Sequence, residues 1–270
     1  MNILILSCIA GVLGTGIGGL LGIIFSKINE KKTNNVLAFA GGCMLIMVFF
    51  SIFPESMELT SPINIFLSAT FGILTLSLIN YILNISTKNK QTKIQAFICN
   101  YQNKNNSKRL LKAGLIMFFA IALHNIPEGL AIGTTGVVNF KTAITLSILL
   151  MIHNIPEGMA ISAPLIAGGM SKIKSLIFAT LAGALTIVGG LIGLIISNIN
   201  SSISALALAF SGGAMLNVTF CDIYPEVFEN QTSSTHIANF LGMGLIFLIV
   251  MFVWKIKIVN SDKVQNCLII

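Results

Sequence analysis

The chain has 270 residues, of which 55% are hydrophobic and only 9% are charged, and its mean hydropathy is +0.90. A soluble domain carries roughly a quarter charged residues, so the composition excludes a soluble protein and indicates an integral membrane protein. The net charge of +7 does not indicate a nucleic-acid partner. The cations lie between the apolar runs, where they orient a membrane protein in the lipid bilayer.

Eight apolar segments are predicted to cross the membrane as helices. A spanning helix needs about 20 apolar residues, and only helices and closed barrels satisfy their backbone hydrogen bonds in lipid. The runs are rich in Leu, Ile, Gly and Ala and lack the alternation of barrel strands, so the predicted fold is an all-α membrane protein forming one polytopic domain over residues 1–270. The predicted spans are residues 3–26, 34–54, 62–85, 113–137, 142–166, 174–198, 203–225 and 236–254.

The loops between the spans predict the orientation. The first span has no cation before Lys27, so we interpret it as a span and not as a cleavable signal. The large loop 86–112 and the loops after spans one and five together hold 12 of the 16 Lys and Arg residues. The positive-inside rule therefore predicts that these loops are cytoplasmic and that both termini lie outside, although three Lys residues near the C-terminus oppose this orientation.

Spans two and seven contain similar sequences. Residues 37–45 read LAFAGGCML and residues 208–216 read LAFSGGAML, and a Pro-Glu pair follows each copy at the same distance. Every residue of the second copy is numbered 171 higher than its counterpart. Eight crossings would place these spans in opposite directions, so we predict an inverted repeat of three, two and three spans, a device of transporters. Chance similarity between Gly-rich helices is the alternative.

Spans four and five each contain the sequence His-Asn-Ile-Pro-Glu-Gly, at residues 124–129 and 153–158. Ionisable side chains inside a membrane are expensive and mark a functional site by default. Residues four apart share a helix face, so each copy presents its His and Glu together with the Asn close by. Imidazole, amide and carboxylate donors suit zinc, iron, manganese or cobalt better than magnesium or calcium. The predicted metal ligands are His124, Asn125, Glu128, His153, Asn154 and Glu157.

The proline of each motif weakens its helix at the same point. Pro127 cannot donate to the carbonyl of Leu123, nor Pro156 to that of Ile152, and in hydrocarbon each freed carbonyl needs another partner. An ion or water in a central pathway could supply it. The alternative is a pair of kinked helices whose His and Glu only bond each other, which the doubling of the motif disfavours.

With these motifs, eight predicted spans and a large loop after span three, the chain resembles the ZIP (Zrt/Irt-like) divalent-metal transporters, especially the bacterial ZupT/GufA-type branch. The resemblance implies multi-pass insertion in the cell membrane, no prosthetic group, and uptake of zinc, with iron, manganese, cobalt and cadmium as further substrates. It implies a binuclear centre bridged by Glu128 and Glu157. His153 would bind one of the two metals, with His124 beside it, and Asn125 and Asn154 would bind the other. A homodimer is left open.

The chain departs from the family pattern at two places. Related members often carry a Glu in span six that completes the second metal site, whereas Thr186 stands there and span six holds no acid. The second site is therefore expected to be weak, absent or filled by water. The loop 86–112 contains no His, so the metal-gathering loop of many relatives is missing. Met44 could give a sulfur ligand or pack in the core, and Asp222 could line the pathway or cap a helix.

Two other functions compete with transport. No nucleotide-binding loop is present, so the chain is not predicted to be an ATP-driven pump by itself. An intramembrane metal-dependent hydrolase needs an open metal position and a general base; HExxH is absent and every candidate base is already a predicted ligand. We therefore predict that the chain is not an enzyme. A metal sensor that binds without transporting is the remaining alternative.

Overall fold

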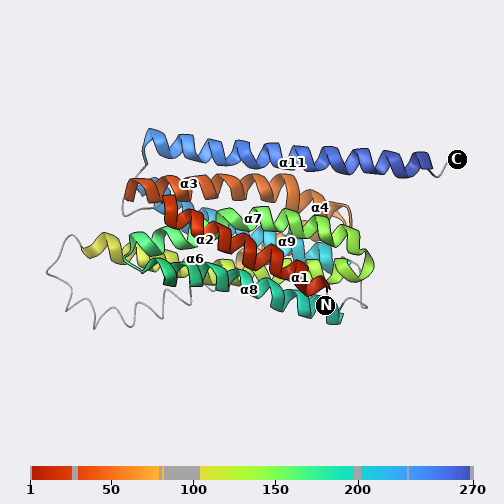
Figure 1. Cartoon of the computed structure of the whole chain (residues 1–270), viewed down its shortest axis with the longest axis horizontal. Coiled ribbons are helices and arrows are strands. Elements are labelled where there is room, and N and C mark those ends of the chain that lie inside the picture. Colours follow the sequence, from red (N-terminus) through yellow and green to blue (C-terminus); the bar gives the residue numbers. More distant parts are fainter. Residues whose placement is uncertain are drawn as a thin grey trace.

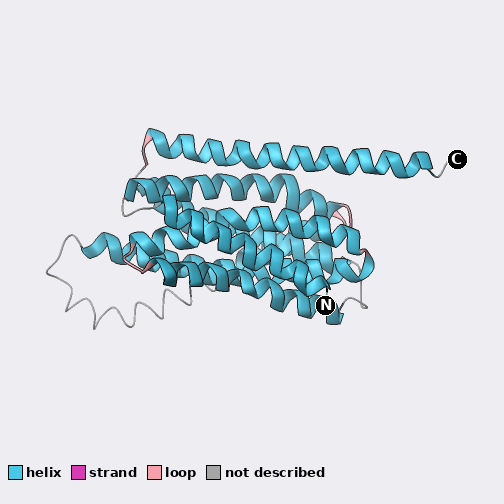
Figure 2. Ribbon diagram, in the orientation of Figure 1, coloured by secondary structure: helices cyan, strands magenta, loops and turns pink. Residues whose placement is uncertain are grey.

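The described part of the chain is folded almost wholly into helices. The structure is a computed structural model that describes residues 2–25, 30–78, 81, 104–196, 202–229 and 231–267. Every regular element in these ranges is a helix (Figure 2), as predicted. Seven helices are long and apolar enough to cross a membrane, and a shorter apolar helix, Pro62–Leu78, accompanies them. This set is compatible with eight spans and agrees with a multi-pass membrane protein.

The helices run alongside one another along the long axis of the molecule (Figure 1). The first membrane helix comprises α1 (Asn2–Cys8), the π-helical turn η1 (Ile9–Leu13) and α2 (Gly14–Phe25). The second comprises α3 (Glu30–Met47), η2 (Val48–Ile52) and α4 (Phe53–Met57). After Pro62–Leu78 come α6 (Lys104–Val138), α7 (Phe140–Ala167) and α8 (Lys172–Ile196). The last elements are α9 (Ser202–Asn217), η3 (Val218–Ile223), α10 (Tyr224–Glu229) and α11 (Ser233–Cys267).

Two helices, α6 and α11, extend farther beyond their predicted spans than the others do. α6 begins at Lys104, inside the predicted loop 86–112, and α11 continues to Cys267, past the predicted end at 254. The early turns of α6 are held by tertiary contacts, because Arg109 forms ion pairs with Glu226 and Glu229 of α10. Residues 86–103 of the loop and residues 82–85 of the third predicted span lie outside the described part.

Spans two and seven share a local distortion as well as a sequence. Each contains a π-helical turn, Val48–Ile52 in one and Val218–Ile223 in the other. A proline follows each turn, Pro54 and Pro225, and it cannot donate to the carbonyl four residues earlier. A wider turn accommodates that missing hydrogen bond. The matched turns are compatible with the predicted repeat.

The close contacts of α2 with α7 correspond to those of α8 with α6. A Cβ added to Gly18 of α2 would meet the carbonyl oxygen of Ile155, and one added to Gly189 of α8 would meet that of Ile126. Gly189 is numbered 171 above Gly18, and the two isoleucines occupy the same place in the two motifs. The offset of the repeat therefore extends to spans one and six, and in both pairs only a glycine lets the backbones approach this closely.

Close glycine contacts sort the helices into two groups. The ligand group consists of α1, η1, α2, α6, α7 and α8, and the frame group of α3, Pro62–Leu78, α9 and α11. In the frame group, Gly42 of α3 lies against the carbonyl of Asn239 in α11, and Gly213 of α9 lies against that of Ala69. Each group takes helices from both halves of the predicted repeat. Large buried side chains from both groups, among them Met44, Met117, Ile121 and Met215, form one hydrophobic core.

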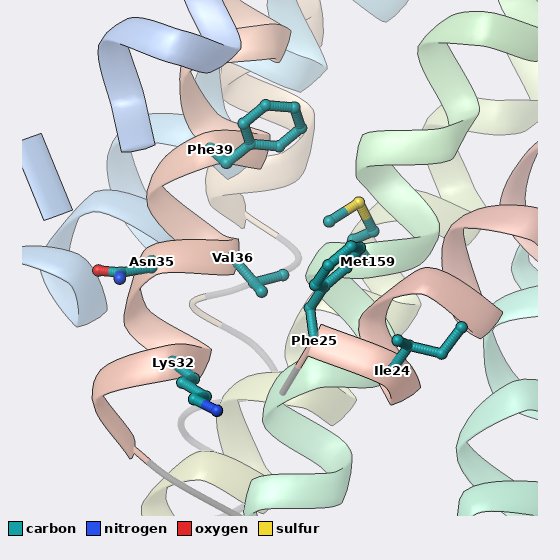
Figure 3. A pocket seen from close by; sticks show the side chains of 7 residues that line it. All are labelled: Ile24, Phe25, Lys32, Asn35, Val36, Phe39 and Met159. Atoms are coloured by element: carbon teal, nitrogen blue, oxygen red, sulfur yellow. The ribbon is translucent and has the colours of Figure 1, made fainter. Parts of the chain in front are cut away.

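The boundary between the groups is loosely packed at one end. A cavity of about 440 Å³ lies where α2 and α7 of the ligand group face α3 of the frame group (Figure 3). Its lining is apolar apart from one lysine and one asparagine, and comprises Ile24, Phe25, Lys32, Asn35, Val36, Phe39 and Met159. The helices within the ligand group are therefore in closer contact with one another than α2 and α7 are with α3 at this cavity.

We predict that Gly189→Ala lowers the midpoint of thermal unfolding, whereas Gly244→Ala does not. The added methyl at position 189 would meet the Ile126 carbonyl, so α6 and α8 must separate, and overpacking costs about 1–3 kcal/mol. Gly244 of α11 has no neighbouring atom within 4 Å of an added Cβ, and alanine favours a helix. Thermal unfolding of the purified variants in detergent micelles measures both; equal midpoints would contradict the assigned helix contact.

Candidate metal centre

Four of the six predicted ligands meet in one buried cluster between α6 and α7. Both helices continue through their motifs, with Pro127 inside α6 and Pro156 inside α7. The ligand atoms of the cluster lie within 4.8 Å of one another. All of its side chains are at most 2% exposed. The cluster consists of His124, Glu128, His153 and Glu157.

The imidazoles and carboxylates of the cluster contact each other across the two helices. His124 Nε2 lies 2.8 Å from Glu157 Oε1, and His153 Nε2 lies 2.8 Å from the same oxygen. His153 Nε2 is also 3.3 Å from Glu128 Oε1. The contact between residues four apart is therefore formed in α7, whereas His124 of α6 reaches the glutamate of the other helix. One carboxylate oxygen, Glu157 Oε1, serves both imidazoles.

Each carboxylate of the cluster keeps a second oxygen without a partner. Glu128 Oε2, Glu157 Oε2 and His124 Nδ1 are buried and make no hydrogen bond. A buried polar atom without a partner costs about 1–3 kcal/mol, and such atoms are rare in folded proteins. The mutual contacts of His and Glu thus leave one oxygen of each carboxylate without a donor, and a bound cation would satisfy these oxygens. This distinguishes the cluster from a closed set of hydrogen bonds.

The two predicted asparagine ligands are held by the helices on either side. Asn125 Nδ2 donates to the carbonyl of Ala182 in α8 at 3.0 Å, and Asn154 Nδ2 donates to the carbonyl of Ala10 in η1 at 2.9 Å. Both side chains are fully buried, and both Oδ1 atoms lack a hydrogen-bond partner. Each amide therefore has its donor engaged and its oxygen available as a ligand.

The residue that replaces the expected span-six acid lies directly behind one motif. A Cβ on Gly129 would meet the backbone oxygen of Thr186, just as a Cβ on Gly158 would meet that of Thr15. Thr186 is numbered 171 above Thr15. Thr15 Oγ1 donates to the carbonyl of Gly11 at 2.9 Å, whereas Thr186 Oγ1 is buried without a hydrogen-bond partner. The hydroxyl of Thr186 packs against Gly11 of η1 but makes no hydrogen bond.

The structure also places the two residues that the sequence left open. The sulfur of Met44 is fully buried and accepts a hydrogen bond from Thr219 Oγ1 at 3.6 Å, which fits a packing role. Asp222 lies in η3 with an intermediate exposure, outside the cluster.

Sequence reasoning did not single out Ser211 of α9. Its hydroxyl lies 3.2 Å from Glu128 Oε1 and 3.4 Å from the carbonyl oxygen of His124. A comparison of residues 37–45 with residues 208–216 could have indicated it. Ser211 is the one position where the second segment has a polar side chain and the first segment, with Ala40, does not.

Comparison with known proteins agrees with the motifs. Residues 86–250 match the family described as ZIP Zinc transporter. The chain is 30% identical over 227 residues to Zinc transporter ZupT of Chlorobium chlorochromatii, covering 80% of this chain and 84% of that protein. It is 28% identical to Zinc transporter ZupT of Chlorobaculum parvum, covering 90% and 94%, and 28% identical to Zinc transporter ZupT of Escherichia coli O127:H6, covering 91% and 96%. The chain belongs to the ZIP zinc transporter family, so it is a multi-pass membrane transporter and not an enzyme, with zinc as transported substrate.

Proposed function

We propose that the chain carries Zn²⁺ across the membrane into the cytoplasm through the cluster of His124, Glu128, His153 and Glu157. The observation that carries the proposal is the burial of two carboxylates and two imidazoles within 4.8 Å, with an unpartnered oxygen on each carboxylate. A divalent cation placed between the carboxylates removes their mutual repulsion in a medium of low dielectric constant.

The donor set fits a transported ion better than a permanent one. Imidazole and carboxylate ligands bind zinc, and the same set accepts iron, manganese, cobalt or cadmium. The cluster contains no thiolate, so it lacks the ligands of the tightest structural zinc sites, and a transported ion has to leave again. Because a metal takes neutral imidazole and ionised carboxylate, its entry displaces protons from the cluster.

The arrangement supports one strong site and a weaker second site. The two histidines and the inner carboxylate oxygens form the first. The second would use the free oxygens of Glu128 and Glu157 with the Oδ1 atoms of Asn125 and Asn154, all of which lack hydrogen bonds. Thr186 offers a neutral hydroxyl in place of a carboxylate, so this site holds its ion less firmly.

Transport requires the cluster to open to each side in turn, and the two helix groups offer a boundary for that movement. The ligand group is joined by close glycine contacts on both sides of the cluster, so we propose that it moves as a unit against the frame group. We therefore propose a movement of the ligand group against the frame group, and not of one half of the predicted repeat against the other, because each group contains helices from both halves. Uptake into the cytoplasm is proposed from the family resemblance, because the residues alone give no direction.

Glu157→Ala and Glu128→Ala are expected to abolish most zinc transport, while Glu58→Ala retains it. Each cluster carboxylate contacts an imidazole and serves both proposed sites, whereas Glu58 is exposed at the end of a helix. Mutating a residue that only hydrogen-bonds to a metal ligand typically weakens metal binding by about 10–100-fold. Removing a ligand itself should weaken zinc binding at least that much. Zinc accumulation in reconstituted vesicles, read with an indicator inside the lumen, measures the effect.

The same vesicles separate transport from its rivals. Time-dependent accumulation of zinc in the lumen supports a carrier, and saturable binding without accumulation would indicate a sensor instead. Normal transport by Glu157→Ala would show that the cluster is not the transport site.

Asn154→Ala is expected to weaken zinc binding by about tenfold or more, and Asn217→Ala to change it little. The first removes a proposed ligand oxygen and leaves the Ala10 carbonyl without its donor. Asn217 is also a buried amide, but its Nδ2 donates to Ser77 Oγ at 2.6 Å in the frame group. Calorimetric titration of both purified variants with zinc compares them; similar affinities would remove Asn154 from the ligand set.

Thr186→Glu is expected to increase the amount of zinc bound per chain at saturation. A carboxylate at this position would supply a charged ligand beside Glu128 and strengthen the second site. Thr186→Gln, which adds similar bulk without charge, is the matched control. The zinc content after equilibrium dialysis gives the stoichiometry, and an unchanged content for the Glu variant would argue against a second site next to Thr186.

A further inference from the structure

Ser211 links the metal cluster to a helix that carries none of its ligands. The cluster belongs to α6 and α7 of the ligand group, whereas Ser211 belongs to α9 of the frame group. The Ser211 side chain is fully buried. It contacts both Glu128 Oε1 and the His124 carbonyl oxygen, so one hydroxyl joins the two groups at the metal site.

This behaviour differs from that of several serines in the same bundle, although Ser204 of α9 also bonds to the Ala131 carbonyl of α6. A helical serine commonly donates to the carbonyl four residues earlier in its own helix. Ser147, Ser56 and Ser175 do so, bonding to Ala143, Ile52 and Ser171. The hydrogen bonds of Ser211 go instead to α6. Its hydroxyl therefore does not serve its own helix.

Packing alone does not require a hydroxyl at this position. The counterpart of Ser211 in the repeat is Ala40, which is also fully buried. The two segments otherwise differ only where Cys43 matches Ala214. A methyl group thus fits the equivalent place in the other helix, and the extra oxygen of Ser211 is found on the side where Glu128 lies.

We propose that Ser211 is a positioning residue for metal capture, a role that rests on the proposed transport function. A hydroxyl has one proton to donate, and a carboxylate attracts it more strongly than a neutral carbonyl does. In the metal-free cluster the proton of Ser211 goes to Glu128 and holds that carboxylate toward His153. The bond is retained when Glu128 binds a cation, so the hydroxyl would hold the carboxylate in its metal-binding orientation.

The test compares zinc binding to purified, detergent-solubilised protein by calorimetric titration. Ser211→Ala should raise the Kd for Zn²⁺ about tenfold, since hydrogen bonds to charged groups are among the stronger ones. Ser147→Ala, which removes an equally buried hydroxyl bonded to its own helix, should change the Kd by less than about twofold. Ser211→Thr keeps the hydroxyl and should restore the affinity. In vesicles, Ser211→Ala should raise KM for zinc by a similar factor without lowering the maximal rate.

A double-mutant cycle shows whether Ser211 acts through Glu128. In a Glu128→Gln background the charged acceptor is gone, so Ser211→Ala should cause little further loss of zinc affinity, whereas a purely structural role would give additive losses. An unchanged Kd for Ser211→Ala, additive losses in the cycle, or equal losses for the Ala and Thr variants would each overturn the proposal. Wild-type protein that binds zinc but does not accumulate it would refute the transport function, while the Kd comparison would still decide the role of Ser211.

Discussion

Two carboxylates and two imidazoles share a buried cluster between α6 and α7, and their desolvation is the constraint on which the rest of the structure depends. Buried charges are tolerated only where close partners compensate for the lost water. Glu157 Oε1 takes both imidazoles, and Glu128 Oε1 receives the Ser211 hydroxyl as well as His153. The compensation is incomplete, because each carboxylate keeps an unpartnered oxygen. A cation would supply the missing partner of these two oxygens, and the cluster is therefore suited to binding and releasing one.

The glycines of α2 and α8 allow these helices to pack closely against the two helices that carry the cluster. Asn125 and Asn154 need the backbone carbonyls of Ala182 and Ala10, and those carbonyls are within reach only if the neighbouring helices approach closely. Glycine at the contact positions permits that approach, and the same contacts join the ligand-bearing helices into one unit. Against the frame group the packing relies on larger side chains and includes a cavity of about 440 Å³. The tight unit and the looser boundary together suit a carrier.

Hydropathy predicted the all-α membrane fold, because apolar length is decisive in lipid. The doubled motif predicted the residues that the structure brings together, since the helical period places His and Glu on one face. Tertiary contacts explain what the sequence left undetermined. α6 begins earlier than its apolar span, and in this early part Arg109 is paired with Glu226 and Glu229. The pairing of His124 with Glu157 depends on how two helices cross, and the contact of Ser211 depends on a third helix. No periodicity within one segment encodes these relations.

The central claim is that the metal is held by the four side chains buried between α6 and α7. Anomalous diffraction at the zinc absorption edge, from crystals of the full chain grown with zinc, tests it most directly. The account predicts an anomalous peak between Glu128 and Glu157, within coordination distance of His124 and His153, that disappears in Glu157→Ala. A strong peak only at other carboxylates, such as Glu226 and Glu229, with none between α6 and α7, would contradict it.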